Sequence, residues 1–398
     1  MKNRFGNDGK KPRQIYQQPL IFNMEDFCGE AFRRIFRKKA MQEESQYIKG
    51  RGAQKNVHNR FFAESYDMLD DFLNYCEAEG DKPDDNRTHY LEVFPKTIVN
   101  KVESPDVGME FSMNAYQGCE HGCIYCYARN SHEYWGYSAG LDFERKILVK
   151  KNAPVLLEEK LKSKNWKAHP IVMSGNTDCY QPAEKKFRIT RQCLEVFLKY
   201  RHPVAIITKN ALIARDMDIV SALAKENLIG VNVSITSLNE KTRQLLEPRT
   251  ATIAKRLDTV KLLSENGVPV NVMLAPIIPG INSHEILPLA KAASDAGALS
   301  IAHTVVRLNG AIGEIFTDWI QKAMPDRAEK VLNQIKACHN GNLNDSRWGE
   351  RMRGDGEFAE MIRSQMGMAR RKFFAGKQFP KLNTALYEQY KGGQLSLF

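Results

Sequence analysis

The clearest regularity in the sequence is an alternation of short apolar runs with longer amphipathic stretches between residues 108 and 308. The apolar runs are rich in Val, Ile and Thr, as buried strands are. Six runs are predicted strands: Ile147–Val149, Ile171–Ser174, Val204–Thr208, Gly230–Ile235, Val270–Ala275 and Ile301–Leu308. Five stretches have helical spacing and begin near a capping residue or Pro: Pro154–Ser163, Thr190–Arg201, Ile213–Glu226, Ile253–Asn266 and Glu285–Ala296. Repeating strand–helix units predict an α/β fold with a parallel sheet, arranged as a barrel or partial barrel.

The two ends of the chain follow a different pattern. Helical spacing returns at Asp326–Cys338 and Gly356–Ala369, and Phe27–Ala40 combines it with a basic opposite face. Met1–Gln18 is polar and predicts disorder until a partner binds. We expect four parts: a basic, partly disordered extension at 1–107, a core at 108–325, a helical extension at 326–390 and a flexible tail at 391–398.

Membrane insertion and secretion are not predicted. No run reaches the roughly 18 consecutive apolar residues of a membrane helix. The first 24 residues lack the apolar centre of a signal peptide. We expect a cytoplasmic protein.

The net charge of +11 is concentrated at the ends of the chain. Residues 1–60 contain 14 Lys and Arg against 6 Asp and Glu, and residues 351–398 contain 9 against 4. Basic segments of this kind can bind a polyanion such as DNA. They can equally form a charged surface whose only effect is to keep the protein soluble.

The candidate chemistry begins with three cysteines, Cys119, Cys123 and Cys126, in a CX3CX2C pattern. Iron–sulfur clusters usually take four thiolates, so three without a near fourth partner predict a cluster with one iron open to a ligand. Gly118 and Gly122 suit a tight loop around such a cluster. Zinc is the alternative, with His121 or a distant Cys completing a tetrahedral site.

The stretch from Tyr116 to Tyr127 closely resembles the signature of the radical-SAM superfamily. This resemblance implies a [4Fe–4S] cluster held by Cys119, Cys123 and Cys126. It also implies S-adenosylmethionine bound at the open iron and cleaved to a 5′-deoxyadenosyl radical. The implied fold is a partial (β/α)6 TIM-like barrel with mainly helical N- and C-terminal extensions. An electron donor such as flavodoxin or ferredoxin is implied as well.

Further positions of the superfamily are carried over to residues that follow predicted strands. The turn that holds the methionyl amine through its backbone corresponds to Ser174, Gly175, Asn176 and Thr177, without the usual Glu. Lys209 is expected to pair with the methionyl carboxylate, and Ser234 to contact the carboxylate or the ribose. Tyr125 is expected beside the cofactor. The alternatives are a surface charge for Lys209 and a core hydroxyl for Ser234.

Within the superfamily, the chain resembles the group of spore photoproduct lyase and an uncharacterised bacterial family described as DNA repair photolyase-like. The resemblance rests on Gly-Arg-Gly-Ala at 50–53, Cys-Glu-His-Gly-Cys at 119–123, Thr-Asp-Cys-Tyr-Gln-Pro at 177–182 and Glu-Pro-Arg-Thr at 247–250. It implies a lyase acting on DNA, with Cys179, Tyr180 and Arg249 as candidates for the reaction itself. Cys179 could equally be a core residue, and Glu247 and Arg249 could form an ion pair.

Three interpretations of the function stay open, of which a radical-SAM enzyme acting on DNA is the first. A radical-SAM enzyme can act on RNA, on a protein or on a small molecule, because one fold serves many substrates. A metal-stabilised protein that binds nucleic acid without turnover is the third.

The last residues, Gln394, Leu395, Leu397 and Phe398, resemble the peptide by which bacterial repair proteins bind the replication sliding clamp. The apolar side chains would fill pockets of the clamp, while the Gln fixes the register. The alternative is an apolar end folded back on the protein.

Overall fold

The computed structural model describes residues 47–62 and 87–391, all within one compact unit, Tyr47–Phe398. The predicted disorder at Met1–Gln18, the predicted helix Phe27–Ala40 and the predicted clamp peptide lie outside the described residues.

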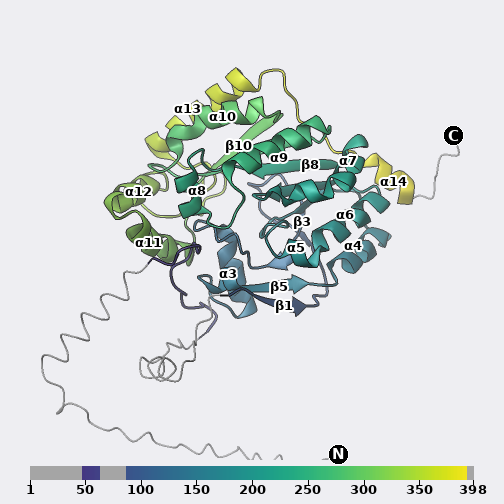
Figure 1. Ribbon diagram of the computed structural model, residues 1–398, viewed down its shortest axis with the longest axis horizontal. Helices are drawn as coiled ribbons and strands as arrows, with labels where there is room; N and C mark the ends of the chain where they lie inside the picture. The colour runs from purple at the N-terminus through teal and green to yellow at the C-terminus, as the bar shows by residue number, and fades with distance from the viewer. Residues whose placement is uncertain (1–46, 63–86, 392–398) are drawn as a thin grey trace, which may run out of the picture. The chain divides into compact units, whose positions relative to one another are not determined.

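The main element is a seven-stranded sheet (Figure 1). Its strand order is β10-β9-β8-β7-β6-β3-β2, and only β2 runs antiparallel to its neighbour. The strands are β2 (Val99–Lys101), β3 (Phe111–Met113), β6 (Ile171–Met173), β7 (Val204–Thr208), β8 (Ile229–Ser234), β9 (Val270–Ile277) and β10 (Ser300–Val305). The edge strands β10 and β2 do not pair, so the six parallel strands form an open, partial barrel.

A second, three-stranded sheet has the order β1-β5-β4. It comprises β1 (His89–Val93), β4 (Tyr116–Gln117) and β5 (Lys146–Lys150). Strand β4 leads directly into the three cysteines, so this small sheet fixes the start of their loop.

Helices follow most strands of the main sheet and pack in series along its outer side (Figure 1). Those between β5 and β10 are α4 (Ala153–Lys162), α5 (Glu184–Phe187), α6 (Ile189–Lys199), α7 (Met217–Lys225), α8 (Glu240–Leu246), α9 (Ile253–Glu265) and α10 (Ile286–Asp295). The others are α3 (Asp142–Arg145), α11 (Ile312–Ala323), α12 (Pro325–Ala337), α13 (Gly356–Phe373) and α14 (Ala385–Lys391). Short 3-10 helices are η1 (Tyr127–Trp135), η2 (Ala211–Asp216) and η3 (Ser283–Glu285).

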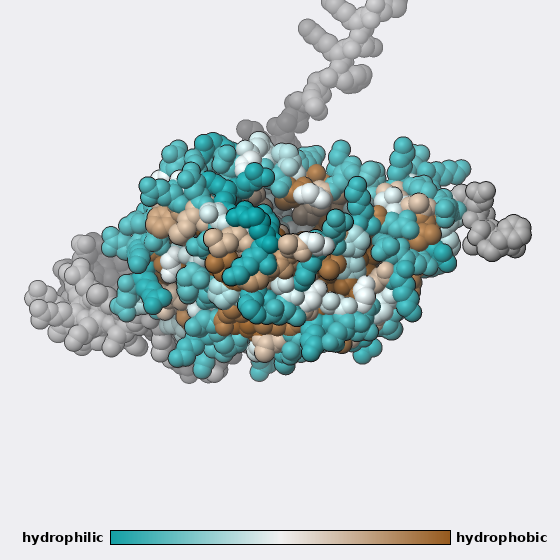
Figure 2. Space-filling view, turned by 90° about the horizontal axis from the view of Figure 1, so that it is seen from above, coloured by the Kyte–Doolittle hydropathy of each residue, from teal (hydrophilic) through white to brown (hydrophobic). Residues whose placement is uncertain are grey.

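The core lies between the sheet and these helices. Helix α6 shows the principle, because its buried Ile189, Cys193 and Phe197 recur every four residues and therefore share one face. In β7, Val204, Ile206 and Thr208 are buried while the residues between them are half-buried, as the period of two requires. The face of the molecule in Figure 2 is largely hydrophilic, with hydrophobic residues grouped near its middle.

The predicted α/β fold is confirmed, with corrections to particular elements. Ile147–Val149 is a strand, β5, but it belongs to the small sheet. The sixth parallel strand is instead β3, whose three residues are too few to show a periodic signal. The predicted N-terminal extension also contributes strands β1 and β2 rather than helices alone in its described part. No helix among the described residues is long and apolar enough to cross a membrane.

Candidate active site

The three cysteines lie on one loop, residues 118–126, which we call the cysteine loop. It turns tightly, since Gly118 and Gly122 have φ of 79° and 66°. The Cys119 amide donates to the Phe143 carbonyl at 2.8 Å, and the Cys126 amide donates to the Cys123 carbonyl at 3.3 Å. Cys119 and Cys123 are buried, Cys126 is half-buried, and all three thiols are free.

The donor set of this loop fits an iron–sulfur cluster. Burial raises the pKa of the Cys119 thiol, and the neighbouring Asp178 and Cys123 raise it further. Burial likewise raises the pKa of Cys123 to about 12, against the opposing effect of Lys209. Buried thiols with high pKa values become thiolates when a cationic metal centre binds beside them.

A single metal ion fits less well. No group of three or more His, Cys, Asp or Glu side chains in residues 47–62 and 87–391 is arranged to hold one ion. In a cluster each thiolate binds a different iron, so the three sulfurs need not converge on one point. The cysteine loop therefore suits a cluster better than zinc.

A segment after α8 supports the cysteine loop from one side. The Ile124 amide donates to the Leu246 carbonyl at 3.0 Å, and the Arg249 amide donates to the His121 carbonyl at 3.3 Å. The Glu-Pro-Arg-Thr sequence thus contacts the cysteine loop through its backbone as well as its side chains.

Glu247 is the centre of a buried polar network within that contact. Its carboxylate accepts hydrogen bonds from the hydroxyls of Tyr125 and Thr236, the latter at 2.7 Å, and lies 2.5 Å from the Arg256 guanidinium. Burial alone would raise the pKa of Glu247, but Arg256 and Lys209 outweigh it and lower the pKa to about 2. A charged Glu247 thereby holds Tyr125 next to Cys123 and Cys126.

Residues 50–53 support the cysteine loop from another side. The amides of Gly52 and Ala53 donate to the Glu144 carboxylate at 3.2 and 2.8 Å. Glu144 forms a fully buried ion pair with Arg129 at 2.5 Å, and Arg129 Nε donates to the Cys123 carbonyl at 3.1 Å. These contacts join the Gly-Arg-Gly-Ala segment to the back of the cysteine loop.

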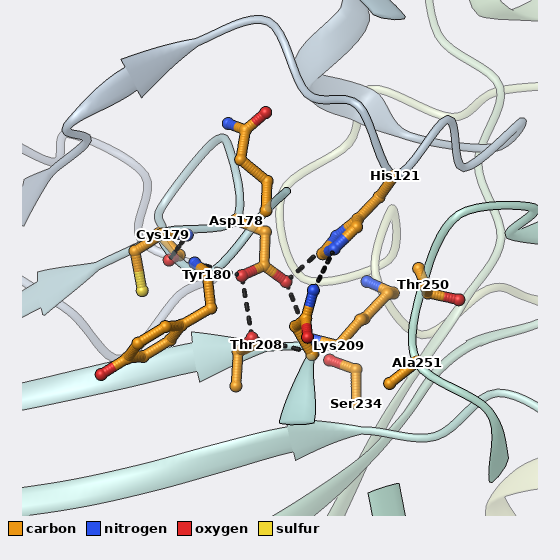
Figure 3. A network of polar contacts seen from close by, with 12 residues as sticks. His121, Asp178, Cys179, Tyr180, Thr208, Lys209, Ser234, Thr250 and Ala251 are labelled. Atoms are coloured by element: carbon orange, nitrogen blue, oxygen red, sulfur yellow. Dashed lines mark hydrogen bonds and ion pairs between the residues drawn. The ribbon is translucent and has the colours of Figure 1, made fainter. Parts of the chain in front are cut away.

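His121, inside the cysteine loop, is bound to protein groups at both ring nitrogens (Figure 3). Nδ1 lies 3.3 Å from the Asp178 carboxylate, and Nε2 lies 3.1 Å from the Asn210 amide nitrogen. Asp178 also accepts from Thr208 Oγ1 at 2.8 Å and from the Lys209 amide at 2.7 Å. Both nitrogens are engaged, so His121 does not serve as the fourth zinc ligand considered from the sequence.

The turn after β6 contains the four residues predicted to hold the methionyl amine. Ser174 adopts a φ of 76°, a left-handed conformation that is costly for a residue other than Gly. The amides of Asn176 and Thr177 donate to Asn114 Oδ1 at 2.8 and 3.2 Å. The Gly175 carbonyl accepts a hydrogen bond from the Tyr127 hydroxyl. The turn is therefore fixed next to the end of the cysteine loop.

Lys209 directly follows β7 and Ser234 is the last residue of the neighbouring strand β8 (Figure 3). The Lys209 ammonium lies 5.9 Å from the centre of the Tyr125 ring and forms no hydrogen bond or ion pair with the described residues. Burial lowers its pKa, but the nearby thiols of Cys123 and Cys126 and the Glu247 carboxylate raise it overall. Ser234 is buried, and its carbonyl accepts from Arg256 at 2.9 Å.

The three residues predicted to take part in the reaction itself have different surroundings. Cys179 and Tyr180 are buried in the main core, where the Tyr180 hydroxyl donates to Asp216 at 3.2 Å. Arg249 lies 3.9 Å from Glu120 on the cysteine loop. The ion pair between Glu247 and Arg249, one of two alternatives from the sequence, does not form, because Glu247 pairs with Arg256 from α9.

Several residues of the site were not identified as such from the sequence, notably Asp178, Arg129, Glu144, Asn210 and Arg256. Each of them has a partner in the site at least nine residues away in the chain, beyond the reach of a local motif. Asp178 carries the only sequence signal, since it belongs to the Thr-Asp-Cys-Tyr-Gln-Pro segment.

Comparisons with known sequences identify the family of the chain. A sequence model described as the radical SAM superfamily matches residues 113–293, which include the cysteine loop. An uncharacterized protein of Methanocaldococcus jannaschii is 32% identical over 197 residues, covering 49% of this chain and 70% of that protein. An uncharacterized protein of Mycobacterium tuberculosis is 28% identical over 240 residues, which cover 60% of this chain and 71% of that protein.

Solved structures with the same fold include spore photoproduct lyase. One mutant has a TM-score of 0.55 at 13% identity, covering 88% of this chain and 95% of that chain. Another mutant, with bound AdoMet and dinucleoside spore photoproduct, has a TM-score of 0.53 at 13% identity and also covers 88% of this chain and 95% of that chain. At this identity the similarity shows a shared fold. The chain belongs to the radical SAM superfamily and is an enzyme that uses a [4Fe–4S] cluster and S-adenosylmethionine.

Proposed function

We propose that this radical-SAM enzyme holds its cluster through Cys119, Cys123 and Cys126 and acts on DNA, in the manner of a repair lyase. The observation that carries the ligand assignment is a set of three free thiols on one tight loop, facing Lys209 at the carboxyl edge of the parallel strands. Active sites of barrel enzymes lie at that edge.

The surrounding residues have matching roles in this proposal. The backbone of Ser174, Gly175, Asn176 and Thr177 holds the methionyl amine of S-adenosylmethionine. Lys209, whose ammonium has no partner among the described residues, binds the methionyl carboxylate. Ser234 contacts the carboxylate or the ribose, and Tyr125 packs beside the cofactor.

The cofactors supply the difficult chemistry when bound. The cluster and S-adenosylmethionine would supply one-electron radical chemistry, with the electron coming from a donor such as flavodoxin or ferredoxin. The protein's own residues position the cofactor and substrate. Cys179 and Tyr180 are proposed to return hydrogen to the product, and Arg249 to orient the substrate.

The proposed DNA substrate rests on two observations. The net charge of +11 favours a polyanion. The solved structures that share the fold include a lyase complexed with a dinucleoside photoproduct. RNA, a protein or a small molecule are the competing substrates. The proposed clamp contact through Gln394, Leu395, Leu397 and Phe398 would bring the enzyme to replicating DNA.

Anaerobic reconstitution with iron and sulfide tests the core of the proposal. The intact chain should bind about four irons and form 5′-deoxyadenosine from S-adenosylmethionine under a strong reductant. Replacing any one of Cys119, Cys123 and Cys126 with Ser should abolish both properties. The matched control is Cys193→Ala, which changes a core cysteine on α6 and should retain the iron. Stoichiometric zinc without cleavage would contradict the proposal.

Substrate and partner need separate assays. Ultraviolet-damaged DNA should increase the formation of repaired product and of 5′-deoxyadenosine more than undamaged DNA does. If only RNA or only peptide increases 5′-deoxyadenosine formation, DNA is not the substrate. The ratio of repaired product to 5′-deoxyadenosine should fall in Cys179→Ala but not in Cys193→Ala. Equal clamp binding by the intact chain and a variant without residues 394–398 would exclude the clamp contact.

A further inference from the structure

The loop between α12 and α13 bridges the two unpaired edges of the main sheet. Residues 345–354, here called the bridging loop, run beside the end of β10, where the Val305 amide donates to the Met352 carbonyl at 3.0 Å. Arg351 then reaches the connection between β2 and β3, donating to Ser104 Oγ at 2.6 Å and pairing with Asp106. The bridging loop therefore spans the side on which the partial barrel is open.

An exposed aromatic ring projects from the bridging loop. Trp348 is 58% exposed, although a Trp side chain normally contributes to a core. Its ring lies against the Arg351 guanidinium, whose central carbon is 3.7 Å from the ring centre. The Gly349 amide donates to the Asp106 carboxylate at 2.7 Å, which holds the backbone next to the ring. Trp348 is thus presented to solvent on a fixed support.

Two arginines of this region form no side-chain hydrogen bond or ion pair with the described residues. Arg307, which follows β10, is half-buried and forms no hydrogen bond or ion pair within residues 47–62 and 87–391. Arg353 is exposed and is equally without a partner in that part of the chain. Burial and the positive charge of Arg351 lower the pKa of Arg307, against the opposing effects of Tyr127 and of Asp106, which is itself paired with Arg351.

Arg307 and the bridging loop are linked to the cysteine loop by Tyr127. Arg307 lies close enough to the Tyr127 hydroxyl to interact electrostatically. That hydroxyl donates to the Gly175 carbonyl, in the turn proposed to hold the methionyl amine. Tyr127 directly follows Cys126, and its ring is 49% exposed. Arg307 and Tyr127 therefore lie between the bridging loop and the proposed cofactor site.

We propose that Trp348 and Arg307 form a nucleotide-binding site at the open side of the barrel, in which the indole stacks on an unpaired base and the guanidinium binds a backbone phosphate. An exposed ring accepts any base, while an arginine that forms no ion pair with the described residues suits the phosphate. This inference rests on the proposed function and adds to it the place where a nucleic-acid strand enters. The strand is DNA or RNA, since both offer this chemistry.

A binding assay with a fluorescein-labelled twelve-nucleotide single strand tests the site. Trp348→Ala should weaken binding roughly tenfold. Arg307→Gln should weaken it and reduce the dependence of log K on log salt by about one unit. Trp348→Phe should retain most of the affinity, because the ring remains. Parallel strands of oligothymidylate and oligouridylate distinguish DNA from RNA.

Two matched controls separate the site from general effects. Lys261→Gln removes one positive charge from the exposed face of α9, and Phe94→Ala removes a similarly exposed ring next to β1. Both should bind the strand like the intact chain. Thermal unfolding of every variant identifies any loss caused by misfolding, and Arg307→Lys then tests the charge in a folded protein.

The outcomes of this assay and of the cofactor assay are separable. Unchanged binding by folded Trp348→Ala and Arg307→Gln overturns the nucleotide site, even if the intact chain cleaves S-adenosylmethionine. Binding that is lost in both variants supports the site, even if the intact chain fails to cleave the cofactor. An intact chain that cleaves S-adenosylmethionine but binds neither strand also overturns the site and leaves the enzyme assignment in place.

Discussion

The backbone of Gly52 passes so close to Gly122 that a Cβ atom on Gly52 would lie 1.8 Å from the Gly122 carbonyl oxygen. No side chain fits in that space, because the two nearest atoms belong to the Gly122 backbone. The Gly-Arg-Gly-Ala segment is therefore packed directly against the cysteine loop, and the Gly at position 52 is a steric requirement.

Gly52→Ala should displace either segment and lower the stability of the folded protein by roughly 1–3 kcal/mol or more. Iron bound after reconstitution should fall with it, because the cysteine loop loses its support. Gly108→Ala is the control, since no atom lies within 4 Å of its added Cβ. Urea unfolding and iron analysis measure both effects, and equal results for the two variants would refute the packing role.

Glu247→Gln should destabilise the protein by about 3 kcal/mol, because it leaves the buried Arg256 without its charge partner. The Tyr125 hydroxyl also loses a charged acceptor, so we expect lower iron occupancy. Asp218→Asn provides the comparison, because it breaks an exposed pair with Arg191 and should barely change the urea midpoint. If both substitutions shift the midpoint equally, the Glu247 network is not the support described above.

Lys209→Gln should weaken the binding of S-adenosylmethionine to the reconstituted protein about tenfold to a hundredfold, the usual range for a charge-assisted hydrogen bond. Calorimetry with protein of matched iron content gives the measurement. Lys225→Gln, at the exposed end of α7, removes the same charge elsewhere and should not alter the affinity. Equal affinities for both variants would exclude Lys209 as the carboxylate partner.

We expect the buried side chain of His202 to lower the free energy of unfolding in acid. Burial lowers its pKa to about 4, while its ring accepts a hydrogen bond from Trp166 Nε1 at 3.0 Å. Between pH 6.5 and 4 the unfolded chain binds a proton that the folded chain excludes, so stability is full above pH 6.5 and falls as the pH drops towards 4. The contribution is at most roughly 3 kcal/mol.

His202→Gln should reduce that pH dependence while keeping an acceptor for Trp166. Unfolding free energies measured from pH 4 to 7 give the difference between the two proteins. Carboxyl groups titrate in both, so the difference isolates His202. Parallel curves would show that His202 does not titrate in this way.

The sequence predicted best the strands and helices that are long enough for their buried positions to repeat at the spacing of a strand or a helix. Strands β7 to β10 and helices α4, α6, α9 and α12 appear within one to three residues of the predicted bounds. Strand β3 has only three residues and was not predicted. The lengths of apolar runs carry no information about sheet membership, which explains why Ile147–Val149 was assigned to the wrong sheet.

The candidate site was predictable only where its residues are consecutive. The cysteine loop is a local motif, so its spacing was sufficient. By contrast, the partner of Glu247 depends on how α9 packs, and no local rule favours Arg256 over the nearer Arg249. Arg307 belongs to no motif, and it becomes notable only because it forms no ion pair with the described residues of the folded chain.

The supports of the cysteine loop have a consequence for how the protein is made. One support comes from residues 50–53 and another from residues 246–250, on either side of the loop in the chain. The cavity for the cluster is thus complete only after Thr250 has left the ribosome. Newly synthesised cysteines would wait, as reduced thiols, for more than a hundred further residues before the metal centre can be installed in its finished surroundings.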